Sequence, residues 1–394
     1  MGFRWSAVQI RPPRYFIYRG REAMKAVILV GGEGTRLRPL TCNITKAMVP
    51  ILNRPFLEYL IRYLKEHSIT DIILAMNYLP DRIQSYFGDG AELGVHLTYL
   101  IEEQPLGTAG AVKNAEAFLD EPFFVLNGDI LTGIDLTAMM SLHREIKPKA
   151  SIALTPVDNP TIYGVVESDA KGMVKRFVEK PSWQQVTTNM INAGIYILEP
   201  EVLSYVSPST PSMFEHHLFP LLLRMGEPIL SYPSDTYWID IGTPEKYLKV
   251  HHDLLLGKAP SLSSYWGNVN EGVQIGSNST IHPSAEIEGP VLIGESCVIA
   301  RRVEVRGPAV LGPRCEVAEG AIVEGAIQWH DSKVGKKAML RNCIVASHSY
   351  IQEGSQVLDN CVLGDNVVVG RNNRLARGIR VWPDKRIEAG TISF

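Results

Sequence analysis

Aliphatic side chains recur at every sixth position through the C-terminal third of the chain, and this repeat restricts the fold more than any other feature. The first unbroken run is Ile275, Ile281, Ile287, Ile293, Ile299, Val305, Leu311, Val317 and Val323. The phase slips through residues 324–342, and the repeat resumes at Val345, Ile351, Val357, Leu363, Val369, Leu375, Val381 and Ile387. A short fixed period is typical of a solenoid, and hexapeptides specify a parallel β-helix.

A second set of inward-facing positions lies two residues before each aliphatic residue, because side chains alternate along a strand. Small and β-branched residues dominate this set, which includes Cys297, Cys315, Cys343 and Cys361. The first two cysteines are 18 residues apart, as are the last two. If each coil has three sides of six residues, each pair stacks on neighbouring coils. We expect these cysteines to be small buried core residues rather than metal ligands or redox groups.

The N-terminal part has a different pattern, in which apolar strands alternate with amphipathic helices. Strands are predicted at 26–30, 71–76, 123–126, 151–155, 163–167 and 194–198. Apolar residues at helical spacing predict helices at 56–64 and 247–256. This alternation favours a mainly parallel sheet that is covered on both faces. The sequence therefore divides into a domain at 24–256, a linker at 257–270 and the repeat domain at 271–394.

Composition excludes several classes of function. Lys and Arg total 39 against 42 for Asp and Glu, which gives a net charge of −3. The chain therefore has no excess of positive charge of the kind that binds nucleic acid or an anionic membrane. No apolar run is long enough to span a bilayer. The 5 cysteines are too few for a disulfide framework. Residues 1–23 are basic but lack the apolar core of a signal peptide, so we interpret them as a mis-set start or a loose tail and expect a cytoplasmic protein.

A glycine-rich segment follows the first predicted strand, and it is the first candidate for chemistry. Gly31, Gly32 and Gly34 would let backbone N–H groups approach a phosphate, and Arg36 adds a cationic fork. Lys46 supplies a second cation ten residues later. The carboxyl end of a parallel strand is where such folds bind their ligands.

Two aspartates and one charged pair complete the candidate site. Asp129 leaves a buried strand toward the expected phosphate crevice, and Asp240 is a second carboxylate from a distant segment. Mg²⁺ is typically held by one or two carboxylates together with substrate oxygens. Glu179 and Lys180 could serve a sugar phosphate, with the lysine on the phosphate and the carboxylate on the hydroxyl groups.

Several motifs resemble, in the same order along the chain, those of the sugar-1-phosphate nucleotidylyltransferases. Segment 30–41 (VGGEGTRLRPLT) with Lys46 is similar to the family signature. Segments 177–181 (FVEKP) and 191–194 (INAG) are similar to its sugar-phosphate segments, and 238–244 (WIDIGTP) resembles its second metal segment. With the hexapeptide tail and 105–110 (PLGTAG), the sequence most resembles the mannose-1-phosphate guanylyltransferases.

The resemblance implies a fold and a reaction. The fold is α/β: a Rossmann-like nucleotidyltransferase domain with a mixed, mainly parallel sheet, followed by a left-handed parallel β-helix. The reaction converts a nucleoside triphosphate and a sugar-1-phosphate into a nucleoside diphosphate sugar and pyrophosphate, with Mg²⁺. Arg36 and Lys46 would neutralise the triphosphate, Asp129 and Asp240 would hold Mg²⁺, and Lys180 would fix the attacking phosphate.

The resemblance also assigns binding positions. Those for the sugar are Gly164, Glu179 and Asn192. Those for the nucleotide are Leu29, Gly31, Gly32, Gly34, Thr35, Gln104, Gly107 and Thr108. Gln104 stands where the resemblance places the residue that reads the base. Its amide offers one donor and one acceptor, whereas guanine presents two donors. GTP with mannose-1-phosphate is therefore the first expectation, and a glucose-1-phosphate thymidylyl- or uridylyltransferase is the alternative.

Two further alternatives belong to other classes. A non-catalytic regulatory subunit would lack the phosphate and metal residues, all of which are present here. A bifunctional enzyme could use the β-helix as an acyltransferase, for which His282, His330 or His348 would be the base. The competing interpretation of the phase slip near His330 is a loop that packs back on the first domain. Because a solenoid has exposed ends, we expect the chain to form a homo-oligomer through its β-helix.

Overall fold

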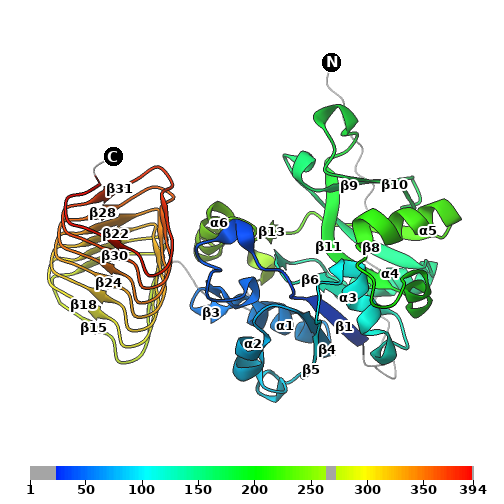
Figure 1. Cartoon of the computed structure of the whole chain (residues 1–394), viewed down its shortest axis with the longest axis horizontal. Coiled ribbons are helices and arrows are strands. Elements are labelled where there is room, and N and C mark those ends of the chain that lie inside the picture. The colour runs from blue at the N-terminus through cyan, green and yellow to red at the C-terminus, as the bar shows by residue number, and fades with distance from the viewer. Residues whose placement is uncertain (1–23, 263–271, 393–394) are drawn as a thin grey trace.

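The chain forms an α/β domain and a solenoid of stacked coils, shown side by side in Figure 1. The computed structural model describes residues 24–262 and 272–392. The predicted basic leader and most of the predicted linker lie outside the described residues. Among the described helices, none is long and apolar enough to cross a membrane.

The α/β domain is built on one mixed sheet. Its order is β10-β9-β11-β6-β1-β4-β5, with β8 beside β11 and β12 beside β8. The strands are β1 Met24–Leu29, β4 Ile69–Met76, β5 His96–Ile101, β6 Phe123–Asn127, β8 Ala150–Pro156, β9 Gly164–Ser168, β10 Val174–Glu179, β11 Met190–Leu198 and β12 Ile229–Pro233. Strands β6, β1, β4 and β5 are parallel, whereas β11 runs antiparallel to β6, β8 and β9.

Two hydrophobic cores cover the two faces of this sheet. Ala26 and Ile28 of β1 belong to one core and Val27 to the other, as the alternation of side chains along a strand requires. The helices are α1 Phe56–Glu66, α2 Pro80–Phe87, α3 Gly107–Asn114, α4 Leu136–Ile146, α5 Phe219–Met225 and α6 Pro244–Leu255. The predicted strands and the helices α1 and α6 are confirmed, with shifted ends.

Two small antiparallel pairs supplement the main sheet. The pairs are β2 Pro50–Ile51 with β3 Arg54–Pro55, and β7 Ile130–Thr132 with β13 Trp238–Asp240. In the second pair, β7 follows β6 and β13 precedes α6. Asp240 ends β13 and Asp129 directly precedes β7.

The repeat domain is a three-sided parallel β-helix, as the six-residue period predicts. One face comprises β14 Val273–Ile275, β17 Val291–Ile293, β20 Ala309–Leu311, β23 Ile327–Gln328, β26 Ile344–Val345, β29 Val362–Leu363 and β32 Arg380–Val381. The next comprises β15 Thr280–Ile281, β18 Val298–Ile299, β21 Glu316–Val317, β24 Lys333–Val334, β27 Tyr350–Ile351, β30 Val368–Val369 and β33 Arg386–Ile387. The third comprises β16 Glu286–Glu288, β19 Glu304–Arg306, β22 Ile322–Glu324, β25 Met339–Arg341, β28 Gln356–Val357 and β31 Arg374–Leu375.

The phase slip is the loss of one residue at each of two stacked corners. Val310 pairs with Ile327, and Ile327 pairs with Ile344, so these coils advance by 17 residues instead of 18. Gly325 and Asn342 occupy the shortened corners with φ of 59° and 44°. Glycine and asparagine tolerate this left-handed conformation, which lets the corner close with one residue fewer.

The cysteines stack inside the solenoid as the spacing predicts. Parallel pairing of β18 with β21 and of β26 with β29 places Cys297 beside Cys315 and Cys343 beside Cys361. All four are fully buried free thiols. They fill the core between successive coils.

The solenoid face that contains β20, β23 and β26 packs on the α/β domain. Val310, Ile327 and Trp329 belong to the same hydrophobic cluster as α6. Trp329 Nε1 donates to the hydroxyl of Tyr247 at 2.9 Å, and that hydroxyl donates to the carbonyl of Pro50. The expected packing of the slip region on the first domain is therefore confirmed, but it is made by regular coils and not by the loop that the sequence suggested.

Candidate active site

A cavity of about 490 Å³ opens at the carboxyl ends of β1, β4 and β6, where parallel strands of this kind of sheet bind ligands. It is lined by many of the residues singled out from the sequence. These are Leu29, Gly31, Gly32, Gly34, Thr35, Arg36, Lys46, Gly107, Thr108 and Asp129.

The glycine-rich turn at residues 31–34 makes close contacts that exclude larger side chains. Gly34 has φ of 63°, and a Cβ there would lie 3.1 Å from side-chain carbons of Lys46 and Thr41. The Thr41 hydroxyl donates to the Gly34 carbonyl at 2.8 Å and holds the turn closed. The turn leads directly into the 3₁₀ turn Thr35–Leu37, which carries Arg36.

The predicted metal carboxylates come from segments more than a hundred residues apart. Antiparallel pairing of β7 with β13 sets Asp240 opposite Ile130, and the Ile241 N–H donates to the Asp129 carbonyl at 2.9 Å. Asp129 lines the main cavity, whereas Asp240 lines a second hollow together with Tyr163 and Lys246. Carboxylate oxygens are the ligand type that a hard divalent cation prefers.

Lysines accompany both carboxylates. Lys46 Nζ lies 2.6 Å from Asp129 Oδ2, and Lys246 from α6 pairs with Asp240. Burial opposes ionisation of Asp129, but Lys46, Arg36 and Lys246 outweigh burial and lower its pKa. Asp129 is therefore held as a carboxylate, the form that binds cations.

Lys246 and Tyr163 are site residues that the sequence reasoning missed. The Tyr163 hydroxyl donates to Asp240 Oδ1 at 2.7 Å and accepts from Lys246 Nζ at 2.5 Å. Lys246 follows Asp240 by six residues, after the turn that starts α6. A lysine in the first turn of a helix that follows a predicted metal segment is the signal that could have pointed to it.

The predicted sugar-binding residues lie outside the lining of the main cavity. The Lys180 N–H donates to the Tyr163 carbonyl at 2.9 Å, and its side chain is 69% exposed. Gly164 packs tightly against Glu179, because a Cβ on the glycine would lie 2.8 Å from the glutamate carboxylate. Burial, and then the nearby Glu215 carboxylate, raise the pKa of Glu179.

A polar chain connects Asn192 to the cavity. Asn192 Nδ2 donates to the Tyr196 hydroxyl at 2.8 Å, and that hydroxyl donates to Glu215 Oε1 at 3.3 Å. The Thr108 hydroxyl, which lines the cavity, lies 3.4 Å from Glu215 Oε2. The structure thus links the predicted sugar and nucleotide positions through Tyr196 and Glu215, neither of which was predicted.

The structure places Gln104 differently from the expectation. Gln104 is exposed and does not line the cavity, whereas Glu102 is buried and does. Glu102 Oε2 accepts a hydrogen bond from the Leu106 N–H at 3.0 Å, and burial raises the pKa of this carboxyl group. An acidic side chain, with acceptors only when ionised, therefore faces the cavity where an amide was expected.

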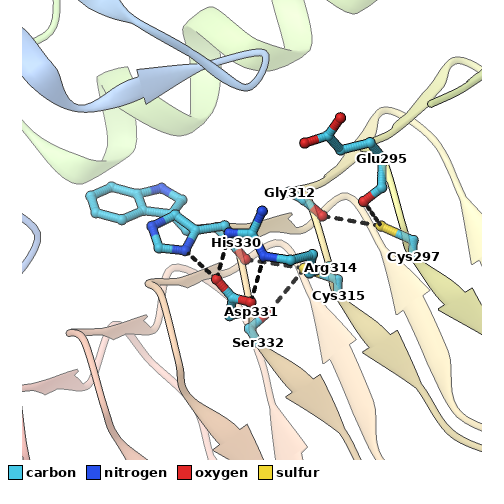
Figure 2. Close-up of polar contacts among 9 residues, drawn as sticks. Glu295, Cys297, Gly312, Arg314, Cys315, His330, Asp331 and Ser332 are labelled. Atoms are coloured by element: carbon cyan, nitrogen blue, oxygen red, sulfur yellow. Dashed lines mark hydrogen bonds and ion pairs between the residues drawn. The ribbon is translucent and has the colours of Figure 1, made fainter. Parts of the chain in front are cut away.

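Among the three solenoid histidines, His330 takes part in an ion-pair cluster with Asp331 and Arg314 on the β-helix surface (Figure 2). His330 Nδ1 lies 2.7 Å from Asp331 Oδ2, and Arg314 holds both oxygens of that carboxylate at 2.8 and 2.7 Å. His348 stacks edge-on against His330, with ring centroids 5.1 Å apart, whereas His282 bonds to Ser284. Because Arg314 binds both carboxylate oxygens of Asp331, we interpret this cluster as a salt bridge between neighbouring coils.

Comparisons with known proteins agree with this geometry. Residues 25–256 match the Nucleotidyl transferase family, and residues 270–375 match the left-handed β-helix (LbH) domain of EIF2B subunit epsilon. A mannose-1-phosphate guanyltransferase of Debaryomyces hansenii is 38% identical over 93% of this chain and 98% of its own length. A UTP–glucose-1-phosphate uridylyltransferase of Synechocystis is 34% identical over 85% of this chain and 90% of its own length.

A solved structure shares the first domain. HddC from Yersinia pseudotuberculosis, complexed with GMP-PN, has a TM-score of 0.50 and 32% identity, and the match covers 57% of this chain and 97% of that one. With the family match spanning more than half of the sequence, the chain belongs to the nucleotidyl transferase family, as a sugar-1-phosphate nucleotidyltransferase with a C-terminal left-handed β-helix.

Proposed function

We propose that this enzyme joins GTP and mannose-1-phosphate to give GDP-mannose and pyrophosphate. The observation that carries the proposal is the cavity at the ends of β1, β4 and β6, where the glycine turn, two cations and a carboxylate converge. Glu102 favours guanine, because its ionised carboxylate accepts from both N1–H and N2–H of that base. Relatives named mannose-1-phosphate guanyltransferases, at 37–39% identity over 93% of the chain, support the sugar.

In the proposed reaction an oxygen of the sugar phosphate attacks the α-phosphorus in line. The new P–O bond forms as the bond to the β-phosphate oxygen breaks, and the electron pair leaves with pyrophosphate. Arg36 and Lys46 neutralise the charge of the triphosphate and of the leaving group. Lys180 orients the attacking phosphate, and Glu179 and Asn192 accept hydroxyl hydrogens of the sugar. No covalent enzyme intermediate is needed, so positioning and charge stabilisation supply the catalysis.

Nucleotidyltransferases of this family use a divalent metal, and we propose Mg²⁺ for this enzyme, held by Asp129 and Asp240. The donor set fits the chemistry of the ion, because Asp129, directly before β7, and Asp240, at the end of β13, are carboxylates whose backbones the pairing of these strands brings together. A bound Mg²⁺ would polarise the phosphates and offset their charge. In the structure, Lys46 and Lys246 neutralise the charge of these two carboxylates. A bound metal would take over that role, and both lysines could then turn toward anionic oxygens of the substrate.

A substrate matrix tests the proposal. Four nucleoside triphosphates are each combined with mannose-, glucose-, galactose- and N-acetylglucosamine-1-phosphate, and pyrophosphate release is measured. We expect the highest kcat/KM for GTP with mannose-1-phosphate. Preference for UTP or dTTP with glucose-1-phosphate would establish the alternative, which the Synechocystis relative supports. No release from any pair would favour a regulatory subunit.

Removal of a metal carboxylate tests the mechanism in the same assay. We expect Asp129→Asn to reduce kcat by about 10²- to 10³-fold, the range for losing one electrostatic contact to the transition state. A chelator should abolish wild-type turnover, and added Mg²⁺ should restore it. Asp120→Asn is the control, because that carboxylate is exposed and pairs with Lys25 instead. Near-normal turnover of Asp129→Asn with Mg²⁺ present would contradict the assignment.

We further propose that the enzyme works in the cytoplasm as a homo-oligomer. All five cysteines are free thiols, as expected in a reducing compartment. The β-helix supports the proposed assembly, because it offers coil ends and faces that the first domain leaves uncovered.

A further inference from the structure

One arginine of the solenoid reaches the catalytic domain at its active-site turn. Arg380 lies on β32, and its Nη1 donates to the carbonyl oxygens of Arg36 and Arg38, each at 3.3 Å. Its Nη2 lies 3.6 Å from Glu245 Oε1. A single guanidinium therefore touches two segments of the first domain that are more than 200 residues apart in sequence.

Both segments carry residues of the proposed site. Arg36 and Arg38 belong to the turn that follows the glycine segment. Glu245 is in the first turn of α6, between the Asp240 strand and Lys246. The two segments touch each other as well, because a Cβ on Gly242 would lie 3.1 Å from Arg36 Nη2. Arg380 thus contacts both segments from the solenoid.

Neighbouring contacts strengthen the attachment. Asn43, between the signature turn and Lys46, donates to Asp365 Oδ2 of the solenoid at 3.1 Å. On α6 the contacts alternate along the chain: Glu245 faces Arg380, Lys246 pairs with Asp240, and Tyr247 bonds to Trp329. Adjacent residues of one helix turn therefore contact the solenoid and the proposed metal site in turn.

We propose that Arg380 is a positioning residue, through which the end of the β-helix holds the signature turn and the Asp240 loop in the geometry that binds the triphosphate. Its planar fork can serve two carbonyl oxygens and a carboxylate at once, which a lysine cannot reproduce fully. The inference rests on the proposed function, and it gives the solenoid a part in the reaction. In the described part of the chain, the polar contacts of Arg380 go to Arg36, Arg38 and Glu245, and none goes to the proposed sugar residues. Its loss should therefore affect the nucleotide selectively.

The test compares Arg380→Ala, Arg380→Lys and the matched control Arg386→Ala. Arg386 lies on the neighbouring face, where it pairs with Glu388. We expect Arg380→Ala to lower kcat/KM for GTP by about tenfold to hundredfold, the scale of a small displacement of catalytic groups. KM for mannose-1-phosphate should stay within about twofold, because ground-state sugar binding is untouched. Arg380→Lys should recover part of the loss, and Arg386→Ala should match the wild type.

Equilibrium binding of GTP with Mg²⁺ provides a readout independent of turnover, and Arg380→Ala should weaken it. Glu245→Gln breaks one contact without changing the solenoid, so it should give a smaller loss of the same kind even if Arg380→Ala proves unstable. Unchanged GTP binding and kinetics in Arg380→Ala, or equal losses for nucleotide and sugar, would overturn the inference. A wild-type enzyme that is inactive with every substrate pair would instead refute the proposed function. In that case the GTP-binding measurement would still test whether Arg380 positions the nucleotide site.

Discussion

At the scale of single residues, the proposed base-reading position depends on which side chain of a short loop faces the cavity. β5 ends at Ile101, and the loop then curls so that Glu102 accepts a hydrogen bond from Leu106 while Glu103 and Gln104 remain exposed. Glu102 is thus fixed at the cavity wall by its own loop. The local turn, rather than the residue type, decides which of three consecutive polar side chains can meet a base.

Glu102→Gln is the sharpest test of this assignment. In glutamine an NH₂ donor replaces one of the two acceptor oxygens, and this donor would face an N–H donor of guanine. An unsatisfied buried donor of this kind costs about 1–3 kcal/mol of binding free energy. We expect kcat/KM for GTP to fall by about tenfold to hundredfold, with less effect on UTP. The adjacent exposed residue supplies the control, Glu103→Gln, which should retain the wild-type preference. An unchanged ratio of GTP to UTP in Glu102→Gln would remove Glu102 from base recognition.

At the scale of elements, regular patterns were predictable and tertiary pairings were not. The six-residue period predicts the solenoid because every coil repeats the same inward positions, and the apolar runs predict β1, β4 and β6 for the same reason. The strands β5, β10 and β12 lack such runs. In β5, for example, only Leu97 is buried, and both end residues, His96 and Ile101, are exposed. Their place in the sheet comes from neighbouring strands.

The candidate site divides in the same way. The glycine turn, Arg36, Lys46 and Asp129 are close in the sequence to the strand ends that position them, so their convergence was predictable. Tyr163 reaches Asp240 across 77 residues of sequence, so no local pattern predicts that contact. Lys246 is only six residues from Asp240, but its approach depends on how the chain turns into α6. Long-range contacts of this kind depend on the packed fold, and a single sequence gives little basis for predicting them.

The junction between α6 and the solenoid carries a prediction of its own. Trp329 is 3% exposed, and it packs in the cluster that joins the two domains. Trp329→Ala should destabilise this junction by about 3–5 kcal/mol, as for other buried aromatic truncations. Trp329→Phe should cost about 1 kcal/mol, the value of the lost hydrogen bond to Tyr247.

Thermal unfolding and limited proteolysis between the domains measure the effect. Trp329→Ala should show a lower melting temperature and faster cleavage into two fragments. Trp382→Ala is the matched control, since that tryptophan is 48% exposed at the end of the solenoid. Equal behaviour of the two variants would argue against a tight junction.

At the scale of the whole molecule, buried histidines couple stability to pH. Burial lowers the pKa of His251 to about 3 and the pKa of His143 to about 4. The unfolded chain takes up these protons near pH 6.5, whereas the folded chain does not. Stability is therefore complete above about pH 6.5 and declines as pH falls toward the folded values, by up to about 1.4 kcal/mol per pH unit for each histidine.

Urea unfolding between pH 8 and pH 5 should reveal this decline as a falling midpoint. His251→Gln should flatten the dependence even if it lowers the midpoint itself, because the group that titrates on unfolding is gone. His282→Gln, on the solenoid surface, should leave the slope unchanged. A midpoint independent of pH in the wild type would contradict the contribution of the buried histidines.

The solenoid also provides a surface for assembly, because the described part of the first domain packs on only one of its three faces. Val298 and Tyr350 are 48% and 40% exposed on the neighbouring face, where they line a hollow of about 720 Å³ with Lys333 and Glu316. Exposed apolar side chains around such a hollow are typical of contact surfaces.

Light scattering after size exclusion should give a mass that is a multiple of 43.7 kDa. Tyr350→Glu should lower that mass, whereas Ile146→Glu on α4, equally exposed but outside the solenoid, should not. A monomer at every concentration would refute assembly, and an oligomer unaffected by Tyr350→Glu would place the contact elsewhere.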